Sequence, residues 1–360
     1  MRSSTGSDLS GLLRRWYRKS RRALPWRETS DPYKIWISEV MLQQTTVAAV
    51  IPYYQRWLRT FPSVHDVASA PLGRVLRHWQ GLGYYARARN IHKSSKIIVN
   101  QYAGRLPGQA AVLRRLPGFG TYTTAAVLSI AFGQPHPVID ANVRRVVSRL
   151  LAIRSAKPLA VDLRISAFLK TSLPFSGAGE FNQALMELGA LVCRPLDPLC
   201  GHCPWHGSCR AKHQGIQQSL PVKQKKVFKK IRTVVAVLRK EKRIFFQRRS
   251  EKGLLAGFWE LPGGKIEKNE SPEKALAREL KEELGVKVKK TGEPVTVKHA
   301  YTSFQVTLLG FECEAQPAPR TDSKHRWFSP KELEKYPVPC GTLRLLRRMK
   351  WLCQQDFKGL

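Results

Sequence analysis

Residues 116–133 read LPGFGTYTTAAVLSIAFG, in which Gly118 and Gly120 lie between two stretches of helical character. Glycines at these positions allow a tight turn and expose consecutive backbone N–H groups at the start of the second helix. Such N–H groups bind anions, and a DNA phosphate is one candidate. Most turns of this kind merely join two helices, so the motif predicts a helical fold first and a phosphate site second.

Two carboxylates occur in the same helical region. Asp140, in PVIDANVRR, follows the glycine turn, and an isolated aspartate in this context most often caps the start of a helix. Glu39, in IWISEVMLQQT, lies on an otherwise apolar helix face. A carboxylate is costly to bury there unless it has a partner or a chemical role. Two carboxylates in different environments can divide the acid and base roles of a reaction.

Four cysteines follow in a C-x6-C-x2-C-x5-C run: Cys193, Cys200, Cys203 and Cys209. Thiolates so close in the chain can enclose a soft metal centre. Zinc sites usually pair two C-x2-C knuckles, and this run has one, so the spacing favours an iron–sulfur cluster with zinc as the alternative. The odd total of 7 cysteines fits metal-bound thiolates in a reducing compartment better than a disulfide framework.

The chain is strongly basic, with 62 Lys and Arg against 26 Asp and Glu and a formal net charge of +36. Such a charge suits a polyanion, namely DNA, RNA or an anionic membrane. No apolar run approaches the roughly 20 residues that a membrane span needs, which disfavours the membrane. The first residues contain no apolar core of a secretory signal. We therefore expect a protein with a polyanionic partner. A cytoplasmic location in a bacterium, with use at the nucleoid, and a monomeric state are also expected.

The sequence predicts three parts, residues 1–213, 214–231 and 232–360. The first part has short apolar-periodic segments separated by Pro and Gly, which is typical of a helical domain. The second part is polar and basic without an apolar period, and it predicts a linker.

The third part predicts an α+β domain. Residues 233–238 and 243–249 are rich in β-branched and aromatic residues around a charged turn, which indicates a hairpin. Ser271 and Gly285 are the expected cap and stop of a helix between them. Residues 297–313 return to strand character.

With these segments assembled, the chain resembles the adenine DNA glycosylase (MutY) family of the helix-hairpin-helix superfamily. The likeness rests on segments in family order: LPWR at 24–27, DPYKIWISEVMLQQT at 31–45, GLGYYARARN at 81–90, LPGFGTYTTAA at 116–126, Asp140, NQALMELGALVC at 182–193 and the cysteine run. The resemblance implies an all-α helix-hairpin-helix glycosylase domain with a [4Fe–4S] cluster loop, followed by an α+β Nudix-like (MutT-like) domain. It also implies base excision repair, in which adenine opposite 8-oxoguanine or guanine is removed from double-stranded DNA.

The resemblance assigns catalytic roles to four residues. Glu39 would protonate N7 of a flipped-out adenine and then activate water. Asp140 would stabilise the oxocarbenium-like sugar, and Asn142 would hold Asp140 or the sugar. Tyr122 stands where strand-cutting relatives carry a lysine that forms a Schiff base, so a monofunctional enzyme that leaves an abasic site is expected. Ala141 departs from the glycine usual in the family, and we expect its methyl group to be tolerated.

Further site residues follow from the same resemblance. The expected adenine pocket consists of Arg22, Trp26, Arg27, Leu42 and Glu187, although Trp26 and Leu42 are equally compatible with core packing. The expected DNA contacts are the wedges Gln44 and Tyr84, the hairpin glycines Gly118 and Gly120, and the cluster-loop arginines Arg194 and Arg210.

The C-terminal part carries a complete Nudix box, G-x5-E-x7-R-E-U-x-E-E-x-G-U, from Gly264 to Val286. Glu279, Glu282 and Glu283 share one face of its helix, where they are candidate Mg²⁺ ligands. A charged helix with internal ion pairs is the simpler alternative. The family loop for 8-oxoguanine tends to read Phe-Ser-His, and this chain has Tyr301, Thr302 and Ser303, which keeps a hydroxyl and loses the imidazole.

Two alternative functions remain. One is an endonuclease III-like glycosylase/lyase acting on oxidised pyrimidines, against which Tyr122 argues. The other is a nucleotide pyrophosphatase activity at the Nudix box, alone or in addition to base removal.

Overall fold

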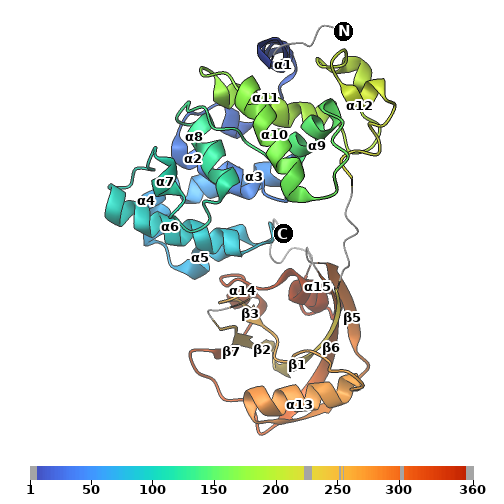
Figure 1. Cartoon of the computed structure of the whole chain (residues 1–360). Coiled ribbons are helices and arrows are strands. Elements are labelled where there is room, and N and C mark those ends of the chain that lie inside the picture. Colours follow the sequence, from blue (N-terminus) through green and yellow to red (C-terminus); the bar gives the residue numbers. More distant parts are fainter. Residues whose placement is uncertain (1–5, 223–228, 251–252, 254, 301–303, 354–360) are drawn as a thin grey trace. The chain divides into compact units, whose positions relative to one another are not determined.

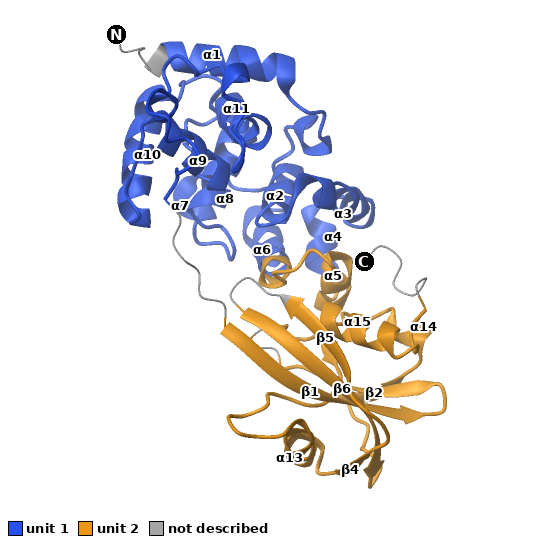
Figure 2. Cartoon of the chain, turned by 90° about the vertical axis from the view of Figure 1, so that its right-hand side faces the viewer, with its two compact units in different colours: residues 1–69, 90–225 blue, residues 70–89, 226–360 orange. Residues whose placement is uncertain are grey.

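The computed structural model describes residues 6–222, 229–250, 253, 255–300 and 304–353. They form two compact units, and each unit is made of two separate stretches of the chain (Figures 1 and 2). Unit 1 comprises Met1–Ser69 and Asn90–Lys225, and unit 2 comprises Ala70–Arg89 and Lys226–Leu360. Each unit is described separately below.

The described residues of unit 1 are built from helices. They comprise α1 (Gly6–Ser20), η1 (Pro25–Arg27), α2 (Pro32–Met41), α3 (Val47–Thr60), α4 (Val64–Ser69), most of α6 (Ala86–Tyr102), α7 (Ala110–Leu113), α8 (Thr121–Ile130), α9 (Ala141–Leu150), α10 (Pro158–Ser172), α11 (Ala178–Leu191), η2 (Cys200–His202) and α12 (Arg210–His213). Here η marks a short 3-10 helix. The helical domain predicted from the sequence is confirmed.

Helix α11 lies at the centre of unit 1. It packs against α1, α8 and α9, and it buries Phe181, Leu185 and Leu188 in the main apolar core. A helix that is apolar on most of its circumference is stable only when other helices surround it. Close contact is possible because Gly179 and Gly189 carry no side chain: a Cβ atom at Gly179 would overlap the carbonyl oxygen of Ser129.

The glycine turn predicted at 116–120 joins α7 to α8. Gly118 has φ +86°, a left-handed conformation that favours glycine, and a Cβ atom there would lie 2.8 Å from Cβ of Asn90. Gly120 precedes α8, and a Cβ atom there would meet no other atom within 4 Å. The N-terminus of α8 is therefore held by a tight turn and has open space beside its last glycine.

Unit 2 is built on a sheet with strand order β3-β2-β1-β6-β4, to which β5 adds beside β6 and β7 beside β2. Its elements are α5 (Leu72–Trp79), β1 (Lys229–Lys240), β2 (Arg243–Arg248), β3 (Trp259–Glu260), α13 (Pro272–Leu284), β4 (Lys287–Lys290), β5 (Val295–Ala300), β6 (Phe304–Gln316), β7 (His325–Phe328), α14 (Pro330–Leu333) and α15 (Cys340–Arg348). The predicted hairpin is confirmed, because β1 pairs with β2 antiparallel, while β1 and β6 run parallel.

Alternation along β1 gives unit 2 two cores. Val235 and Val237 face α15, whereas Val234, Ala236 and Leu238 face α13. Successive side chains of a strand point to opposite faces, so one apolar strand supplies both layers. Figure 1 accordingly shows α13 and α15 on opposite sides of the sheet. The predicted cap and stop of α13 are also confirmed: the Ser271 side chain accepts from the Lys274 N–H, and Gly285 has φ +68°.

The structure differs from the predicted boundaries at two places, the linker and residues 70–89. The linker predicted at 214–231 ends too late, because Lys229–Ile231 already pair with β6, and it begins too early, because Leu220 is buried in unit 1. The strand character predicted at 297–313 is confirmed, because β5 and β6 cover the described residues of this range. Residues 70–89 belong to unit 2, although they were predicted in the helical domain: Gln80 Nε2 donates to the Val338 carbonyl at 2.9 Å, and the Tyr85 and Phe258 rings lie 4.4 Å apart.

None of the helices in the described ranges has both the length and the apolar character that crossing a membrane requires.

The contact between α11 and α8 generates a stability prediction. Gly179→Ala should lower the free energy of unfolding by about 1–3 kcal/mol, because the added methyl group overlaps backbone atoms that cannot move aside. Gly11→Ala in α1 is the matched control, since its new Cβ atom would make only an ordinary contact with Arg15, at 3.6 Å. That change should be neutral or stabilising. Equal unfolding midpoints for the two variants in urea would contradict the close-contact explanation.

Candidate active site and cysteine-lined pocket

Glu39 is a buried carboxylic acid with one hydroxyl donor beside it. It lies on α2 with 4% of its surface exposed, and the Tyr122 hydroxyl of α8 donates to its Oε2 atom at 2.6 Å. Burial raises the pKa of Glu39 to about 7, although the hydrogen bond from Tyr122 opposes this rise. Glu39 can therefore hold or release a proton near neutral pH, as a general acid and base must.

Asp140 faces the same site from the start of α9. Its Oδ1 atom accepts from the Val143 N–H at 2.7 Å, and its Oδ2 atom accepts from Asn142 Nδ2 at 2.9 Å. Its charge contributes to the raised pKa of both Glu39 and Tyr122, which brings these groups into one electrostatic neighbourhood. Burial raises the pKa of Asp140, and its two hydrogen bonds oppose the rise. Asp140 is thus both the helix cap that its sequence context predicted and a member of the candidate site.

A second layer of contacts holds Asn142 in place. Arg145 Nη2 donates to Asn142 Oδ1 at 2.8 Å and to the Gly189 carbonyl at 2.7 Å, and its Nε atom donates to the Cys193 carbonyl at 2.7 Å. A Cβ atom at Gly189 would lie 2.6 Å from Cβ of Asn142. Sequence reasoning missed Arg145, because Arg144 and Arg149 stand on the same helix and no pattern in the sequence distinguishes Arg145 from them.

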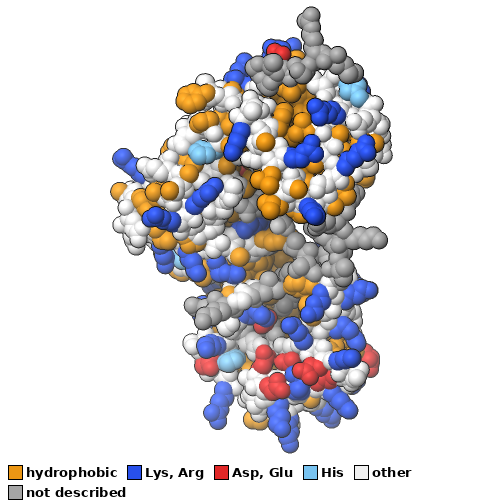
Figure 3. Space-filling view, in the orientation of Figure 1, with side chains coloured by type: hydrophobic (Ala, Val, Ile, Leu, Met, Phe, Trp, Pro, Cys, Tyr) orange, Lys and Arg blue, Asp and Glu red, His pale blue; other side chains and the backbone are white. Residues whose placement is uncertain are grey.

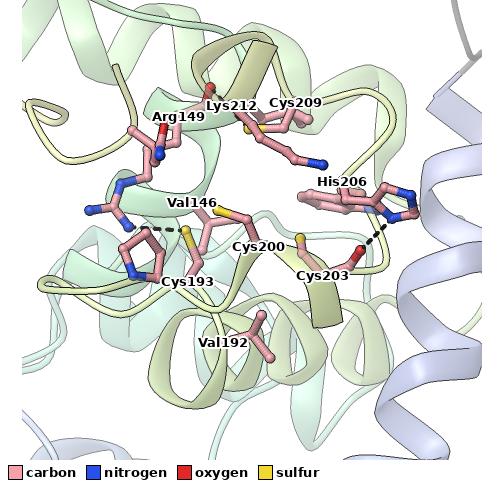
Figure 4. A pocket seen from close by; sticks show the side chains of 13 residues that line it. Val146, Arg149, Val192, Cys193, Cys200, Cys203, His206, Cys209 and Lys212 are labelled. Carbon is pink, nitrogen blue, oxygen red and sulfur yellow. Dashed lines mark hydrogen bonds between the residues drawn. The ribbon is translucent and has the colours of Figure 1, made fainter. Parts of the chain in front are cut away.

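The four cysteines line one apolar pocket, together with Val146, Leu150 and Trp205 (Figure 4). All four are free thiols, and Arg149 Nη1 donates to Cys193 Sγ at 3.4 Å. Burial raises the pKa of the Cys203 thiol to about 12, so this environment disfavours a thiolate without a positive partner. Four sulfur donors in an apolar wall fit a soft metal centre. Within the described residues, no three His, Cys, Asp or Glu side chains form a group ready to hold a single metal ion.

Three of the residues predicted for the adenine pocket form a buried ion cluster. Both arginines donate to each carboxylate oxygen of Glu187 on α11: Oε2 accepts from Arg22 at 2.6 Å and from Arg27 at 2.8 Å, and Oε1 accepts from each of them at 2.9 Å. Glu187 has 1% of its side chain exposed, and Arg27 has 9%. Burial raises the pKa of Glu187, but the hydrogen bonds from both arginines more than compensate and bring it to about 2. Glu187 therefore stays ionised.

The two apolar pocket residues lie differently. Trp26 is buried with its ring edge-on to Tyr54 at 5.4 Å, which fits core packing. Leu42 is half-buried at the C-terminal end of α2. Their contact with a base stays a prediction.

Both predicted wedges have a left-handed backbone. Gln44 has φ +59° and is exposed, and Tyr84, in unit 2, has φ +50° with 39% of its surface exposed. A bulky residue rarely adopts this conformation, and such strain is concentrated at functional sites. The side chain of Tyr84 is held by Arg87. The Arg87 guanidinium lies 5.3 Å from the Tyr84 ring and 5.2 Å from the Trp79 ring.

The cluster-loop arginines differ in freedom. Arg194 is exposed, and its Nη2 atom donates to the Asp197 carbonyl of the same loop at 2.9 Å, so DNA binding would have to redirect it. Arg210 is exposed at the first position of α12. Tyr301, Thr302 and Ser303 lie outside the described residues.

The Nudix box of unit 2 is organised around Arg278. This arginine donates to Glu270 at 2.9 Å, to Glu279 at 3.0 Å and to Glu282 at 3.3 Å. A Cβ atom at Gly264 would overlap the Glu279 carboxylate, so that glycine makes room for it. Glu283 accepts from Gln247 Nε2 at 2.8 Å and from the Gly263 N–H at 3.0 Å. On the face drawn in Figure 3, Asp and Glu side chains gather on one part of unit 2, among scattered Lys and Arg side chains.

Comparisons with known proteins agree with both units. Residues 37–170 match the HhH-GPD superfamily base excision DNA repair protein family, and residues 233–348 match the NUDIX domain. The chain is 33% identical over 400 aligned residues to the adenine DNA glycosylase of Homo sapiens, covering 94% of this chain and 73% of that protein. It is 41% identical over 208 residues to the adenine DNA glycosylase of Mycobacterium tuberculosis, covering 57% of this chain and 67% of that protein.

Solved structures resemble the helical part. A thermostable thymine-DNA glycosylase is 27% identical with a TM-score of 0.53, covering 58% of this chain and 97% of that chain. An endonuclease III–DNA complex is 26% identical with a TM-score of 0.51, covering 59% and 99%. The fold and the paired carboxylates thus define a base excision glycosylase with a Nudix domain. More narrowly, the chain belongs to the adenine DNA glycosylase family, as the resemblance implied.

The ion cluster around Glu187 generates a stability prediction. Glu187→Gln should lower the free energy of unfolding at pH 7 by about 3–5 kcal/mol, because it leaves buried Arg27 without a counter-charge. Because the folded pKa of Glu187 lies below its usual 4.5, this contribution is present above pH 4.5 and is lost as the pH falls through about 2. The difference between variant and parent should therefore shrink in acid.

Glu180→Gln is the matched control for Glu187→Gln. Glu180 lies on the same helix and also pairs with two arginines, Arg14 and Arg18, but 25% of its side chain is exposed. Its loss should lower the free energy of unfolding by about 0–1 kcal/mol. The measurement is the free energy of unfolding of both variants in urea at pH 7 and pH 3. If both variants lost the same free energy of unfolding, burial would not distinguish the two ion clusters.

Proposed function

We propose that the protein is a monofunctional DNA glycosylase that hydrolyses the N-glycosidic bond of adenine opposite 8-oxoguanine or guanine and leaves an abasic site. One observation supports the chemistry above all: Glu39 is a buried acid with a pKa of about 7, beside Tyr122 and in the electrostatic field of Asp140. Membership of the adenine DNA glycosylase family supports the substrate.

Glu39 acts first as the acid. Adenine is a poor leaving group as an anion, and a proton on N7 lets it depart neutral. The flipped-out adenine would take that proton from Glu39, whose burial keeps it protonated up to about pH 7. Once ionised, Glu39 takes a proton from the attacking water. The Tyr122 hydroxyl, which donates to Glu39, stabilises this ionised form.

Asp140 supplies the opposing charge. Bond cleavage leaves an oxocarbenium-like sugar, and a nearby carboxylate stabilises its positive charge. The hydrogen bonds from Val143 and Asn142 favour the ionised form of Asp140 against the effect of burial. Arg145 fixes the amide of Asn142, so the orientation of Asp140 is set before substrate binds.

Tyr122 supports the monofunctional assignment. A lyase needs an amine to form a Schiff base with the sugar, and a phenol cannot form one. Burial and the two carboxylates raise the pKa of Tyr122 well above its usual value, so its hydroxyl stays a proton donor.

We also propose a [4Fe–4S] cluster held by Cys193, Cys200, Cys203 and Cys209, on the chemistry of their pocket. Once bound, such a cluster ties the loop of residues 193–209 together; the residues of that loop contribute no group to bond cleavage, and Arg194 and Arg210 remain available to phosphates. Preference for 8-oxoguanine through Thr302, action as a monomer and a cytoplasmic location are parts of the same proposal.

Glu39→Gln tests the proposed function. Under single-turnover conditions, adenine release from an A:8-oxoguanine duplex should fall at least a thousandfold, because glutamine cannot donate the proton. Duplex binding should persist, and the parent rate should decline above about pH 7, as Glu39 loses its proton. A:G and A:C duplexes define the opposite-base preference.

Three outcomes oppose the proposal. Full activity of Glu39→Gln would refute the acid role of Glu39. Stoichiometric trapping of the protein on DNA by borohydride would favour the endonuclease III-like lyase alternative. Release of oxidised pyrimidines instead of adenine would favour the same alternative.

A second candidate function is Mg²⁺-dependent hydrolysis of a nucleoside triphosphate at the Nudix box. It is favoured by one observation: Arg278 and Gly264 together hold Glu279 and Glu282 in an ordered acidic cluster of a complete box. The described carboxylates do not by themselves form a ready metal group, so Mg²⁺ and the triphosphate would have to draw them together.

The purified full chain should then hydrolyse 8-oxo-dGTP only when Mg²⁺ is present. Glu282→Gln should reduce this turnover at least tenfold, because it removes an exposed carboxylate from the box. Glu273→Gln, at the start of the same helix and paired with Lys290, is the control and should change nothing. Absence of turnover in the parent chain would leave unit 2 as a recognition fold.

A further inference from the structure

Four of the six residues that line a pocket in unit 2 are cationic. The pocket lies where α15 packs against β5, and its lining residues are Thr296, Val297, Lys298, Arg344, Arg347 and Arg348. These residues belong neither to the cysteine run nor to the Nudix box. The pocket is also separate from the Nudix box in space, since α13, the helix of the box, packs on the opposite face of the sheet.

Local structure explains why the cations converge. Arg344, Arg347 and Arg348 stand at helical spacings of three and four residues, which places them on one side of α15. The other side of α15 buries Leu343, Leu345 and Leu346 against the sheet. Lys298 is exposed on β5, and Arg348 Nη1 donates to the Thr296 carbonyl at 2.6 Å. That bond ties the end of α15 to β5 and fixes the cations around one hollow.

Three of the pocket's cations, Lys298, Arg344 and Arg348, have no carboxylate of the described residues as an ion-pair partner. Among the described residues, no Asp or Glu lies within 4.0 Å of the charged atoms of Lys298, Arg344 or Arg348. Elsewhere in unit 2, carboxylates do meet their cations: Arg239 pairs with Glu312, and Arg249 with Glu260. Like charges held together repel, and a bound anion relieves that repulsion.

We propose that this pocket binds the phosphodiester backbone of the duplex DNA on which the enzyme acts. The proposal rests on the proposed function, which makes duplex DNA the substrate. Arginines bind phosphate oxygens through two parallel hydrogen bonds, and several in a row suit successive phosphates. The lining contains no aromatic residue on which a nucleotide base could stack, which favours a backbone over a free nucleotide.

Such contacts position DNA without selecting its sequence. Lys298 and His299 lie in β5, and in the sequence they stand within five residues of Tyr301, Thr302 and Ser303, which lie outside the described residues. A phosphate held at Lys298 would therefore be bound by chain adjacent to the residues expected to recognise 8-oxoguanine.

The test is the salt dependence of DNA binding. The double variant Lys298→Gln, Arg344→Gln removes two exposed cations and leaves the Arg348 bond to β5 intact. Fluorescence anisotropy with an undamaged duplex and with an A:8-oxoguanine duplex, in a Glu39→Gln background, gives the slope of log Kd against log salt concentration. This slope should become shallower by roughly 0.9 for each phosphate that the protein no longer neutralises, up to about 2 in total.

Lys287→Gln, Lys289→Gln is the matched control. It removes the same charge from exposed positions of β4, which pairs with the far end of β6 from β5, and its slope should not change. The conservative pair Lys298→Arg, Arg344→Lys should keep the parental slope. Single-turnover adenine release at saturating enzyme, with Glu39 restored, should stay within about twofold of the parent in Lys287→Gln, Lys289→Gln, whose positions lie outside the pocket.

An unchanged slope in Lys298→Gln, Arg344→Gln, or an equal change in both glutamine pairs, would overturn the proposal, since either result removes any special role of the pocket. Because the undamaged duplex does not depend on catalysis, the binding result stands even if adenine release were absent. Absence of adenine release would refute the proposed function and not the pocket.

Discussion

The backbone of helix α11 lies so close to helices α8 and α9 that two of its positions have no room for a side chain. Gly179 touches the carbonyl of Ser129, and Gly189 touches Asn142. The groups of the candidate site depend on this approach, because α11 also carries Glu187 and leads directly into Cys193. A methyl group added at either glycine would push α11 away from its neighbours. That shift would move both Asn142, which holds Asp140, and Glu187, which pairs with two arginines.

The site contains two buried carboxylates, Glu39 and Glu187, whose pKa values are shifted in opposite directions. Glu39 has one hydroxyl donor and forms no ion pair with the described residues, so burial dominates and its pKa rises. Glu187 is just as inaccessible to solvent, but two guanidinium groups surround it and its pKa falls. The two pKa values differ because of the neighbouring charges and not because of burial. As a result, Glu39 can exchange a proton near neutral pH, whereas Glu187 stays charged.

Features that depend only on residues close together in the chain were predictable from the sequence. The turn at Gly118, the α13 helix between Ser271 and Gly285, and the cysteine run are all short-range patterns. The family resemblance added Glu39, Tyr122 and Asp140 as a group, and the structure places them in one neighbourhood; their catalytic roles stay predictions. What sequence could not supply is pairing across long separations: Arg22 with Glu187, the parallel β1 and β6, and the inclusion of residues 70–89 in unit 2. These depend on packing of distant segments, for which no local pattern exists.

Because residues 70–89 belong to unit 2, the chain crosses between the units three times: after residue 69, after residue 89 and after residue 225. Val75, Leu76 and Trp79 are buried, and Gln80 bonds to Val338, which lies 258 positions later in the chain. During synthesis the segment would emerge long before the strands that complete its unit. Removal of the residues after 225 would therefore take away the carbonyl to which the buried Gln80 amide donates, so residues 70–89 would lose part of the unit to which they belong.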